Sequence, residues 1–367
     1  MLPVTIPKQH KAAVYDKPGS GSTNVTMVDT PEPRFGQVLI NLHGIRTHSG
    51  VCHSDLGVMT NSWRALPFPT PEGQVGGHEG VGVVVKIGPG CDNAGIKEGD
   101  RVGVKWVAAV EVPCLSGSDG LCLNGKISGY YTPGTFQQYV LGPADYVTPI
   151  LDSVPSELAA PMLCAGVTVY AALKRSRAQT GDFVVISGAG GGLGHLATSI
   201  GSRSLGLRVI GVDHGSKKAL VKENGAEAFV DTTCFPKDDK GAAIAGHVKG
   251  LTGGHGAHSV IVCTASNGTY AQAVPMLRFN GSLVCVGIPE GDLVPIATAS
   301  PAPLVFKQLA IQGSAVGTRR DALEVPDLVA RGIVKPHVRA EKIEKLKEVF
   351  EKMDKGLISG RVVIDLS

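Results

Sequence analysis

The chain has 367 residues, a formal net charge of +3, 43% hydrophobic residues and 18% charged residues. That composition predicts a globular protein of roughly two domains and excludes a disordered or fibrous chain. The charge is too small and scattered to favour nucleic acid or an anionic membrane as partner. The sequence contains no run of 18 or more apolar residues, so it predicts no membrane-spanning helix.

The cysteines point to a reducing environment. The first residues lack the apolar core of a secretory signal, and the eight cysteines stand in a long chain. In that setting cysteines are more often metal ligands, nucleophiles or small core residues than a disulfide framework. We therefore expect a cytoplasmic protein.

The elements fall into three stretches, which predict an α/β protein. Short strands separated by Gly, Pro and Asp, such as KAAVYD, QVLINL and GVGVVVKIG, predict a β-rich, barrel-type domain over residues 1–165. Near its end, a helix is expected over 156–176 with Ser156 as N-cap. Strands alternating with helices over 166–315 predict a doubly wound parallel sheet. Residues 316–367 supply another helix (AEKIEKLKEVFEKMDKG) and a last strand (GRVVIDL), and are expected to return to the first domain.

A glycine-rich turn follows the strand FVVIS. The run from Gly188 to Gly194 does not spell G-x-G-x-x-G, but it stands between a predicted strand and a predicted helix. Such a turn lets a backbone approach a pyrophosphate at a helix N-terminus. The predicted cofactor contacts here are Gly188, Gly190, Gly191, Gly192, Leu193 and Gly194.

An acid follows this turn at the expected distance. Asp213 ends the next strand, 19 residues after Gly194 (213 − 194), and no arginine comes directly after it. An acid there suits a ribose 2′-hydroxyl and repels a 2′-phosphate, which favours NAD(H) over NADP(H). The alternative is an ordinary solvated strand end. Lys217 either reaches the adenosine ribose or is an exposed helix lysine.

Three residues combine into a metal-ligand set. Cys52 lies in GVCHSD, His78 in GGHEG and Cys164 in MLCAG. Taken singly, each is more often a core residue than a ligand. Together, two cysteines and a histidine with one open position form the donor set of a catalytic zinc ion, which lowers the pKa of a bound hydroxyl group.

The motifs GVCHSDL, GGHEGVGVVVKIG, SGYYTPGTFQQYV, PMLCAGVTVYAALK and ISGAGGGLG together resemble the zinc-containing alcohol dehydrogenases of yeast and fungi, in the medium-chain dehydrogenase/reductase superfamily. The resemblance runs from about residue 11 to the end. It implies a GroES-like catalytic domain, a Rossmann domain and a homodimer or homotetramer. It also implies NAD(H)-linked interconversion of a primary alcohol and an aldehyde.

The resemblance also assigns roles to individual residues. Cys52, His78 and Cys164 would bind zinc, with Glu79 as alternate or nearby ligand, and Asp55 would orient His78. Ser54 would hydrogen-bond the substrate oxygen and pass on its proton. The remaining assignments are His53 and Arg361 at the pyrophosphate, and Trp63 and Trp106 as walls of a narrow substrate pocket, unless these two are core residues.

The chain departs from that family in three places. Only Cys114 and Cys122 remain of four structural-zinc cysteines, with Glu111 near a lost position, so we expect one catalytic zinc per chain and a weak or absent second site. An apparent insertion, HGIR at 43–46, precedes the first zinc motif, and a gene-model error would also explain it. Gly57 stands where many relatives have a proton-relay histidine.

Three other functions are alternatives to this one. The same chemistry on a larger pathway metabolite is compatible with the small Ser54. A zinc-free quinone reductase of the superfamily is disfavoured by the complete ligand set. A catalytically impaired dinucleotide-binding protein is the non-enzymatic alternative, which the insertion and deletion keep open.

Overall fold

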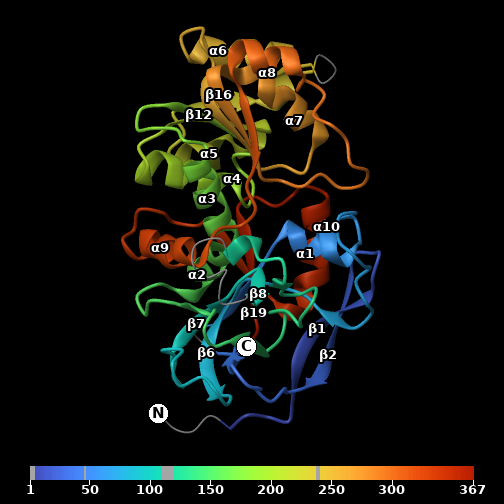
Figure 1. Cartoon of the computed structure of the whole chain (residues 1–367). Coiled ribbons are helices and arrows are strands. Elements are labelled where there is room, and N and C mark those ends of the chain that lie inside the picture. Colours follow the sequence, from blue (N-terminus) through green and yellow to red (C-terminus); the bar gives the residue numbers. More distant parts are fainter. Residues whose placement is uncertain (1–4, 45–46, 110–118, 237–239) are drawn as a thin grey trace. The chain divides into compact units, whose positions relative to one another are not determined.

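The computed structural model describes residues 5–44, 47–109, 119–236 and 240–367. They divide into two compact units (Figure 1). Unit 1 contains Met1–Val167, Thr318–Ala330 and Val338–Ser367, and unit 2 contains Thr168–Gly317 and Arg331–His337.

Unit 1 is built mainly from antiparallel strands. An eight-stranded sheet has the order β10-β3-β6-β4-β19-β18, with β7 paired to β6 and β11 to β7, and a smaller sheet has the order β2-β1-β5. A core of buried Val, Leu, Ile and Phe side chains fills the space between the sheets and α10. The strands are β1 (Gln9–Lys17), β2 (Ser22–Asp29), β3 (Gln37–Asn41), β4 (His48–Val51), β5 (Gln74–Val75), β6 (Gly80–Ile87), β7 (Arg101–Val104), β8 (Val107–Ala109), β9 (Lys126–Ile127), β10 (Tyr139–Pro143), β11 (Thr148–Pro149), β18 (Val338–Lys342) and β19 (Arg361–Asp365). The helices are α1 (His53–Met59), α2 (Ser156–Pro161), α9 (Arg319–Ala330) and α10 (Leu346–Asp354).

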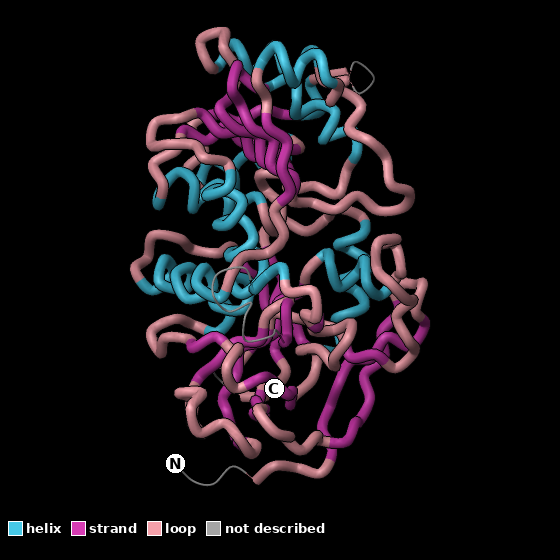
Figure 2. The backbone as a smooth tube through the Cα atoms, in the orientation of Figure 1, coloured by secondary structure: helices cyan, strands magenta, loops and turns pink. Residues whose placement is uncertain are grey.

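Unit 2 is a parallel six-stranded sheet with helices packed against it (Figure 2). Its order, β14-β13-β12-β15-β16-β17, is the 3-2-1-4-5-6 order of the dinucleotide-binding fold. The strands are β12 (Phe183–Ser187), β13 (Arg208–Asp213), β14 (Ala228–Asp231), β15 (Ala257–Val262), β16 (Leu277–Cys285) and β17 (Ala310–Gly313). The helices are α3 (Val167–Arg175), α4 (Gly194–Ser199), α5 (Lys218–Glu223), α6 (Ala242–Leu251), α7 (Asn267–Ala273) and α8 (Pro301–Lys307). The predicted fold class, a Rossmann sheet plus a β-rich GroES-like domain, is confirmed.

Two local predictions are corrected. The C-terminal helix was expected to span 340–356, but Val338–Lys342 is a strand that pairs in parallel with β19, and the helix begins at Leu346. Pairing with a neighbouring strand overrides the helix propensity of Glu and Lys there. Ser156 is the first helical residue rather than the N-cap, which is Pro155.

One continuous helical segment, Ser156–Arg175, is long and apolar enough to cross a membrane by length and composition. However, 83% of its most apolar window is buried inside the protein. A core helix of a soluble protein passes the same test, so this segment is weak evidence for a membrane span.

Candidate active site

Four side chains from three separate segments of unit 1 converge on one point. Cys52 directly follows β4 and caps the N-terminus of α1, His78 and Glu79 directly precede β6, and Cys164 lies in the helical segment after α2. All four are buried, and one ligand atom from each lies within 4.8 Å of the others. This is the set the sequence predicted as zinc ligands, with Glu79 included.

Cys164 owes its position to an irregularity in its helix. Met162–Gly166 forms a π-helical turn between α2 and α3, directly after a proline inside the helix, Pro161. A π turn inserts an extra residue per turn and is common at functional sites. Here it places Cys164 Sγ 3.3 Å from His78 Nε2.

Asp55 fixes the orientation of His78. Its Oδ1 lies 2.8 Å from His78 Nδ1, and its Oδ2 accepts a hydrogen bond from the backbone N–H of Cys52 at 2.9 Å. Burial lowers the pKa of His78. The Asp55 carboxylate and the Cys52 thiolate together raise it by more than burial lowers it, so the pKa of His78 lies above its usual value. With Nδ1–H held by Asp55, Nε2 is the nitrogen that a metal would bind, in exchange for its proton.

The pKa values of the two cysteines shift in opposite directions. A hydrogen bond from Cys164 lowers the pKa of Cys52, helped by Arg361, and the same bond raises the pKa of Cys164. Zn–S and Zn–N bond lengths give a tetrahedral site with edges of roughly 3.5–3.8 Å. The 3.3 Å between His78 Nε2 and Cys164 Sγ is close to such an edge, so the donors fit a zinc ion in both type and spacing.

Glu79 is a fully buried carboxylate with an uneven set of partners. Its Oε1 pairs with Arg361 and lies 3.9 Å from His78 Nε2, while its Oε2 has no hydrogen-bond partner among the described residues. Burial raises the pKa of Glu79 to about 7, against the opposing effect of Arg361. An unsatisfied buried oxygen beside two thiols is a natural contact for a cation.

Gly50 is not among the predicted site residues, yet this geometry requires it. A Cβ on Gly50 would lie 2.0 Å from Glu79 Oε2. Gly50 therefore leaves the space that the carboxylate occupies. The only signal in the sequence was its position directly before the VCHSD motif.

Aromatic side chains form a wall beside this cluster. The ring of Trp106 meets that of His78 edge to face at 4.7 Å, and Trp63 meets Trp106 at 5.9 Å. Ser54 lies next to the cluster, with its Oγ 3.5 Å from Cys52 Sγ. His53 is the first residue of α1 and is half-buried.

Arg361 is placed differently from the sequence-based expectation. It was expected at the pyrophosphate, but it is 4% exposed and its guanidinium contacts Glu79. Burial lowers the pKa of Arg361. Glu79 and the thiolates together raise it by more than burial lowers it, so the guanidinium stays charged. A phosphate contact by Arg361 would require it to leave this partner.

The glycine turn in unit 2 has the geometry of an anion cradle. Gly188 has φ of +79°, and a Cβ on Gly194 would lie 1.9 Å from the Gly188 carbonyl oxygen, so side chains are excluded at both positions. Gly190 N–H donates to Asp213 Oδ2 at 2.8 Å. The stem of Lys217 packs against Gly190. Gly191, Gly192 and Leu193 complete the turn before α4, which begins at Gly194.

This turn lies where dinucleotides bind in such sheets. The strand order reverses between β12 and β15, and the turn follows the carboxyl end of β12. Ligands of open α/β sheets bind at that switch point. Asp213, at the carboxyl end of β13, is next to it.

Some of the residues at which the chain departs from the family pattern lie outside the described residues. Glu111 and Cys114 lie outside the described residues, as do residues 45–46 of the apparent insertion. Cys122 is half-buried, and the described cysteines are all free. His43, at the start of the insertion, bonds the Leu366 carbonyl at 2.8 Å, and the ligand cluster forms beyond it.

Comparisons with known proteins give one consistent result. Residues 35–152 match the alcohol dehydrogenase GroES-like domain, and residues 192–331 match the zinc-binding dehydrogenase family. The chain is 62% identical to alcohol dehydrogenase 2 of Emericella nidulans, with 99% of each chain covered, and 40% identical to an alcohol dehydrogenase of Schizosaccharomyces pombe, with 99% and 100% covered.

Solved structures agree with these matches. Acetophenone reductase from Geotrichum candidum in complex with NAD is 30% identical, with 99% of this chain and 98% of that chain covered and a TM-score of 0.83. An alcohol dehydrogenase of Aeropyrum pernix is 26% identical, with 96% and 99% covered and the same TM-score.

Proposed function

The chain belongs to the zinc-containing alcohol dehydrogenase family, and on that premise we propose that it interconverts a primary alcohol and an aldehyde with NAD(H). The observation that carries the proposal is the buried set of Cys52, His78 and Cys164, with Asp55 on the far nitrogen of the histidine. The complete set disfavours a zinc-free reductase of the same superfamily.

Cys52, His78 and Cys164 would hold the zinc ion, with Glu79 as a fourth, exchangeable donor. Bound there, the metal supplies Lewis-acid stabilisation of negative charge on a hydroxyl oxygen. Asp55 holds Nδ1–H of His78 and so keeps Nε2 aimed at the site. Arg361 pairs with Glu79 and would have to release that carboxylate for it to ligate a metal.

Ser54 is placed to handle the substrate proton. It stands two residues after Cys52, at the start of α1, with its hydroxyl beside the ligand thiol. As donor and acceptor at once, a serine hydroxyl can take the alcohol proton and pass it on. Because residue 57 is glycine, that proton would leave through cofactor hydroxyls and water instead of through a histidine.

The turn in unit 2 would bind the cofactor. The N–H groups of Gly188 and Gly191 bond backbone carbonyls and that of Gly190 bonds Asp213, so the N–H groups of Gly192, Leu193 and Gly194 would face the pyrophosphate. Asp213 would accept from the ribose 2′-hydroxyl, which excludes a 2′-phosphate. Lys217 would contact the adenosine ribose. His53 and Arg361 are the other proposed pyrophosphate contacts, and Arg361 would have to leave Glu79 to make one. These contacts favour NAD(H) over NADP(H).

The substrate is expected to be a short primary alcohol. Trp63 and Trp106 fill the space beside His78 with two large rings in mutual contact. An aromatic wall so close to the reacting oxygen restricts branching near the hydroxyl carbon. The small Ser54 leaves room on the other side, so a larger aldehyde of a specialised pathway is the alternative substrate.

A second copy of the chain is the expected partner. In unit 2, β17 is the last strand of the sheet, and α8, the helix directly before it in the chain, exposes Val305 at 71% and Phe306 at 79%. An open strand edge beside apolar surface favours self-association. The free cysteines among the described residues are consistent with a cytoplasmic location.

Zinc content and activity test the proposal together. We expect about one zinc per purified chain, NAD(H)-linked oxidation of short alcohols, loss of turnover with a chelator and recovery with Zn²⁺. Cys164→Ser should lose the metal, whereas Cys91→Ser, at an equally buried cysteine outside the cluster, should keep it. Nucleotide binding with no chelator-sensitive turnover would instead indicate the catalytically impaired protein. Two zinc ions per chain would contradict the loss of the second site.

A further inference from the structure

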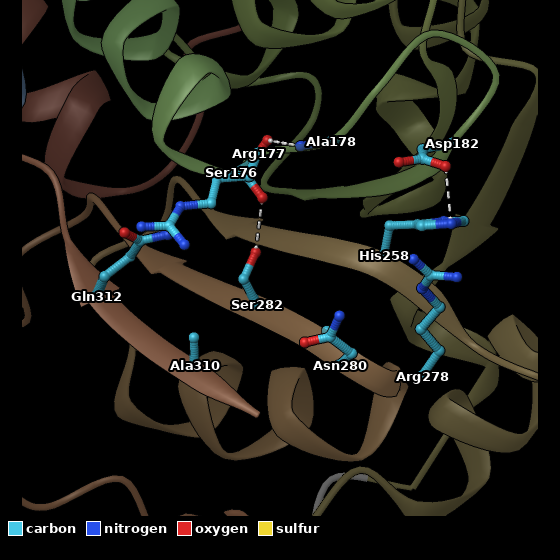
Figure 3. Close-up of a pocket in the computed structure, with 11 residues that line it drawn as sticks. Ser176, Arg177, Ala178, Asp182, His258, Arg278, Asn280, Ser282, Ala310 and Gln312 are labelled. Atoms are coloured by element: carbon cyan, nitrogen blue, oxygen red, sulfur yellow. Dashed lines mark hydrogen bonds and ion pairs between the residues drawn. The ribbon is translucent and has the colours of Figure 1, made fainter. Parts of the chain in front are cut away.

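Unit 2 contains a hollow at the end of the sheet opposite the glycine turn. It has a volume of about 280 Å³ and is lined by residues at or just before the amino ends of β12, β15, β16 and β17 (Figure 3). The dinucleotide turn lies at the carboxyl end of β12, so this hollow is separate from the cofactor site.

Two guanidinium groups in the hollow lack protein partners. Arg177 and Arg278 lie on opposite sides of it, with Asn280 and Ser282 between them (Figure 3). Neither arginine side chain has a hydrogen-bond or ion-pair partner among the described residues. Arg177 is exposed, so its guanidinium is open to water, whereas Arg278 is half-buried and its Nε is fully buried. A buried N–H donor without an acceptor costs free energy, and an anion in the hollow would supply that acceptor.

The one acidic group in the hollow is already engaged. Asp182 Oδ1 lies 2.8 Å from His258 Nε2, and Asp182 Oδ2 accepts from the Gln179 N–H at 2.8 Å. The Phe183 N–H donates to His258 Nδ1, so the ring proton sits on Nε2, facing Asp182. Burial and the nearby Arg278 lower the pKa of His258, which is therefore neutral at pH 7.

The charge balance of the hollow follows from these four groups. Two arginines and one carboxylate leave a net charge of +1, and both oxygens of the carboxylate face donors of their own. An anion in the hollow would therefore be attracted by two guanidinium groups that have no ion-pair partner among the described residues. Guanidinium binds phosphate and carboxylate through paired, charge-assisted hydrogen bonds.

We propose that this hollow binds a small organic dianion, either a phosphate monoester or a dicarboxylate, between Arg177 and Arg278. The volume lies just below the range of about 300–1,000 Å³ for ligand pockets, which excludes a whole nucleotide and leaves space for an anionic group with a short carbon skeleton. The amide of Asn280 and the floor around Ser282 provide neutral contacts. The proposal is independent of the alcohol dehydrogenase activity.

Calorimetric titration of the whole protein tests this site. The probes are inorganic phosphate and succinate, added at constant ionic strength and in the presence of saturating NADH, so that the glycine turn is occupied. We expect a dissociation constant below about 1 mM for at least one probe. Arg278→Gln and Arg177→Gln should each weaken binding at least tenfold while leaving alcohol oxidation unchanged.

Arg203→Gln is the matched control, since it removes the same charge from unit 2 at a guanidinium that bonds the Glu223 carbonyl. Its affinity for both probes should equal that of the parent chain. Preference for phosphate assigns a phosphate monoester, and preference for succinate assigns a dicarboxylate. The proposal is overturned by binding of neither probe, by binding that disappears with NADH, or by equal losses in the Arg203 and Arg278 variants.

Discussion

Gly57 has no side chain, and the ring of Trp63, part of the aromatic wall of the active site, occupies the space beside it. It lies within α1, and a Cβ at this position would be 2.6 Å from Nε1 of Trp63 and 2.8 and 2.9 Å from two ring carbons. Trp63 in turn contacts Trp106, which contacts His78. The change Gly57→Ala therefore displaces a ring that has little freedom to move.

Two opposing effects set the size of the change. Alanine in a helix interior is favoured over glycine by about 0.5–1 kcal/mol. Overpacking a core contact costs about 1–3 kcal/mol. Since three ring atoms are closer than 3.0 Å to the added carbon, the second effect should win, and we expect Gly57→Ala to lose about 1–2 kcal/mol of unfolding free energy.

Calorimetric unfolding measures the loss, and Gly246→Ala is its control. Gly246 lies inside α6 with no atom within 4 Å of its added Cβ, so that variant should gain about 0.5–1 kcal/mol. The only two tryptophans of the chain are Trp63 and Trp106, so their emission should shift in Gly57→Ala alone. A more stable Gly57→Ala protein with unchanged emission would refute the packing described above.

The same contact changes how the missing relay histidine is interpreted. A histidine at residue 57 would occupy space that the Trp63 ring now fills. A Gly57→His variant would therefore disturb both the substrate wall and the proton path. Altered selectivity between short and branched alcohols would report the first effect, and an altered pH profile for one substrate would report the second.

Three further predictions concern the metal, a buried lysine and self-association. Asp55→Asn should weaken zinc binding about 10–100-fold, because His78 loses the partner that fixes its tautomer, and competition with a graded chelator measures the loss. Burial lowers the pKa of Lys105 to about 7, so from pH 7 to 9 the unfolded chain binds more protons than the folded chain. The free energy of unfolding should therefore rise with pH over this range, by about 1–2 kcal/mol relative to Lys105→Met. Parallel pH curves for the two proteins would contradict this. Phe306→Asp should shift the protein to a smaller species in light scattering after gel filtration, and an unchanged mass would move the interface elsewhere.

The cofactor domain was the part most open to prediction from sequence. Strands such as β12, β13 and β15 are short apolar runs, and both faces of a parallel sheet are buried, so the pattern is strong there. The glycine turn and Asp213 are close together in the chain and meet through one strand pair, β12 and β13. Local spacing was therefore enough to predict their contact.

The catalytic domain depended on longer-range pairing. Glu79 and Arg361 are 282 residues apart and form an ion pair that no local pattern predicts. The contact between Trp63 and Gly57 likewise depends on how a loop folds back over α1. Residues 340–342 were predicted as helix but belong to the strand Val338–Lys342, whose pairing partners in β19 lie more than 20 residues later.

The register of a single short strand explains how these distant residues meet. In β4, Ser49 pairs with Gly80 of β6, and Val51 pairs with Val362 of β19. Antiparallel pairing continued by one residue on each side brings Gly50 opposite Glu79, and Cys52 opposite Arg361.

A slip of one residue would turn these side chains to the other face of the sheet and separate the ligands. Gly50, whose N–H bonds the Glu79 carbonyl oxygen at 3.0 Å, belongs to this pairing. The apparent insertion at 43–46 ends before β4 begins at His48. It can therefore lengthen the connection into the strand without changing the register that assembles the metal site.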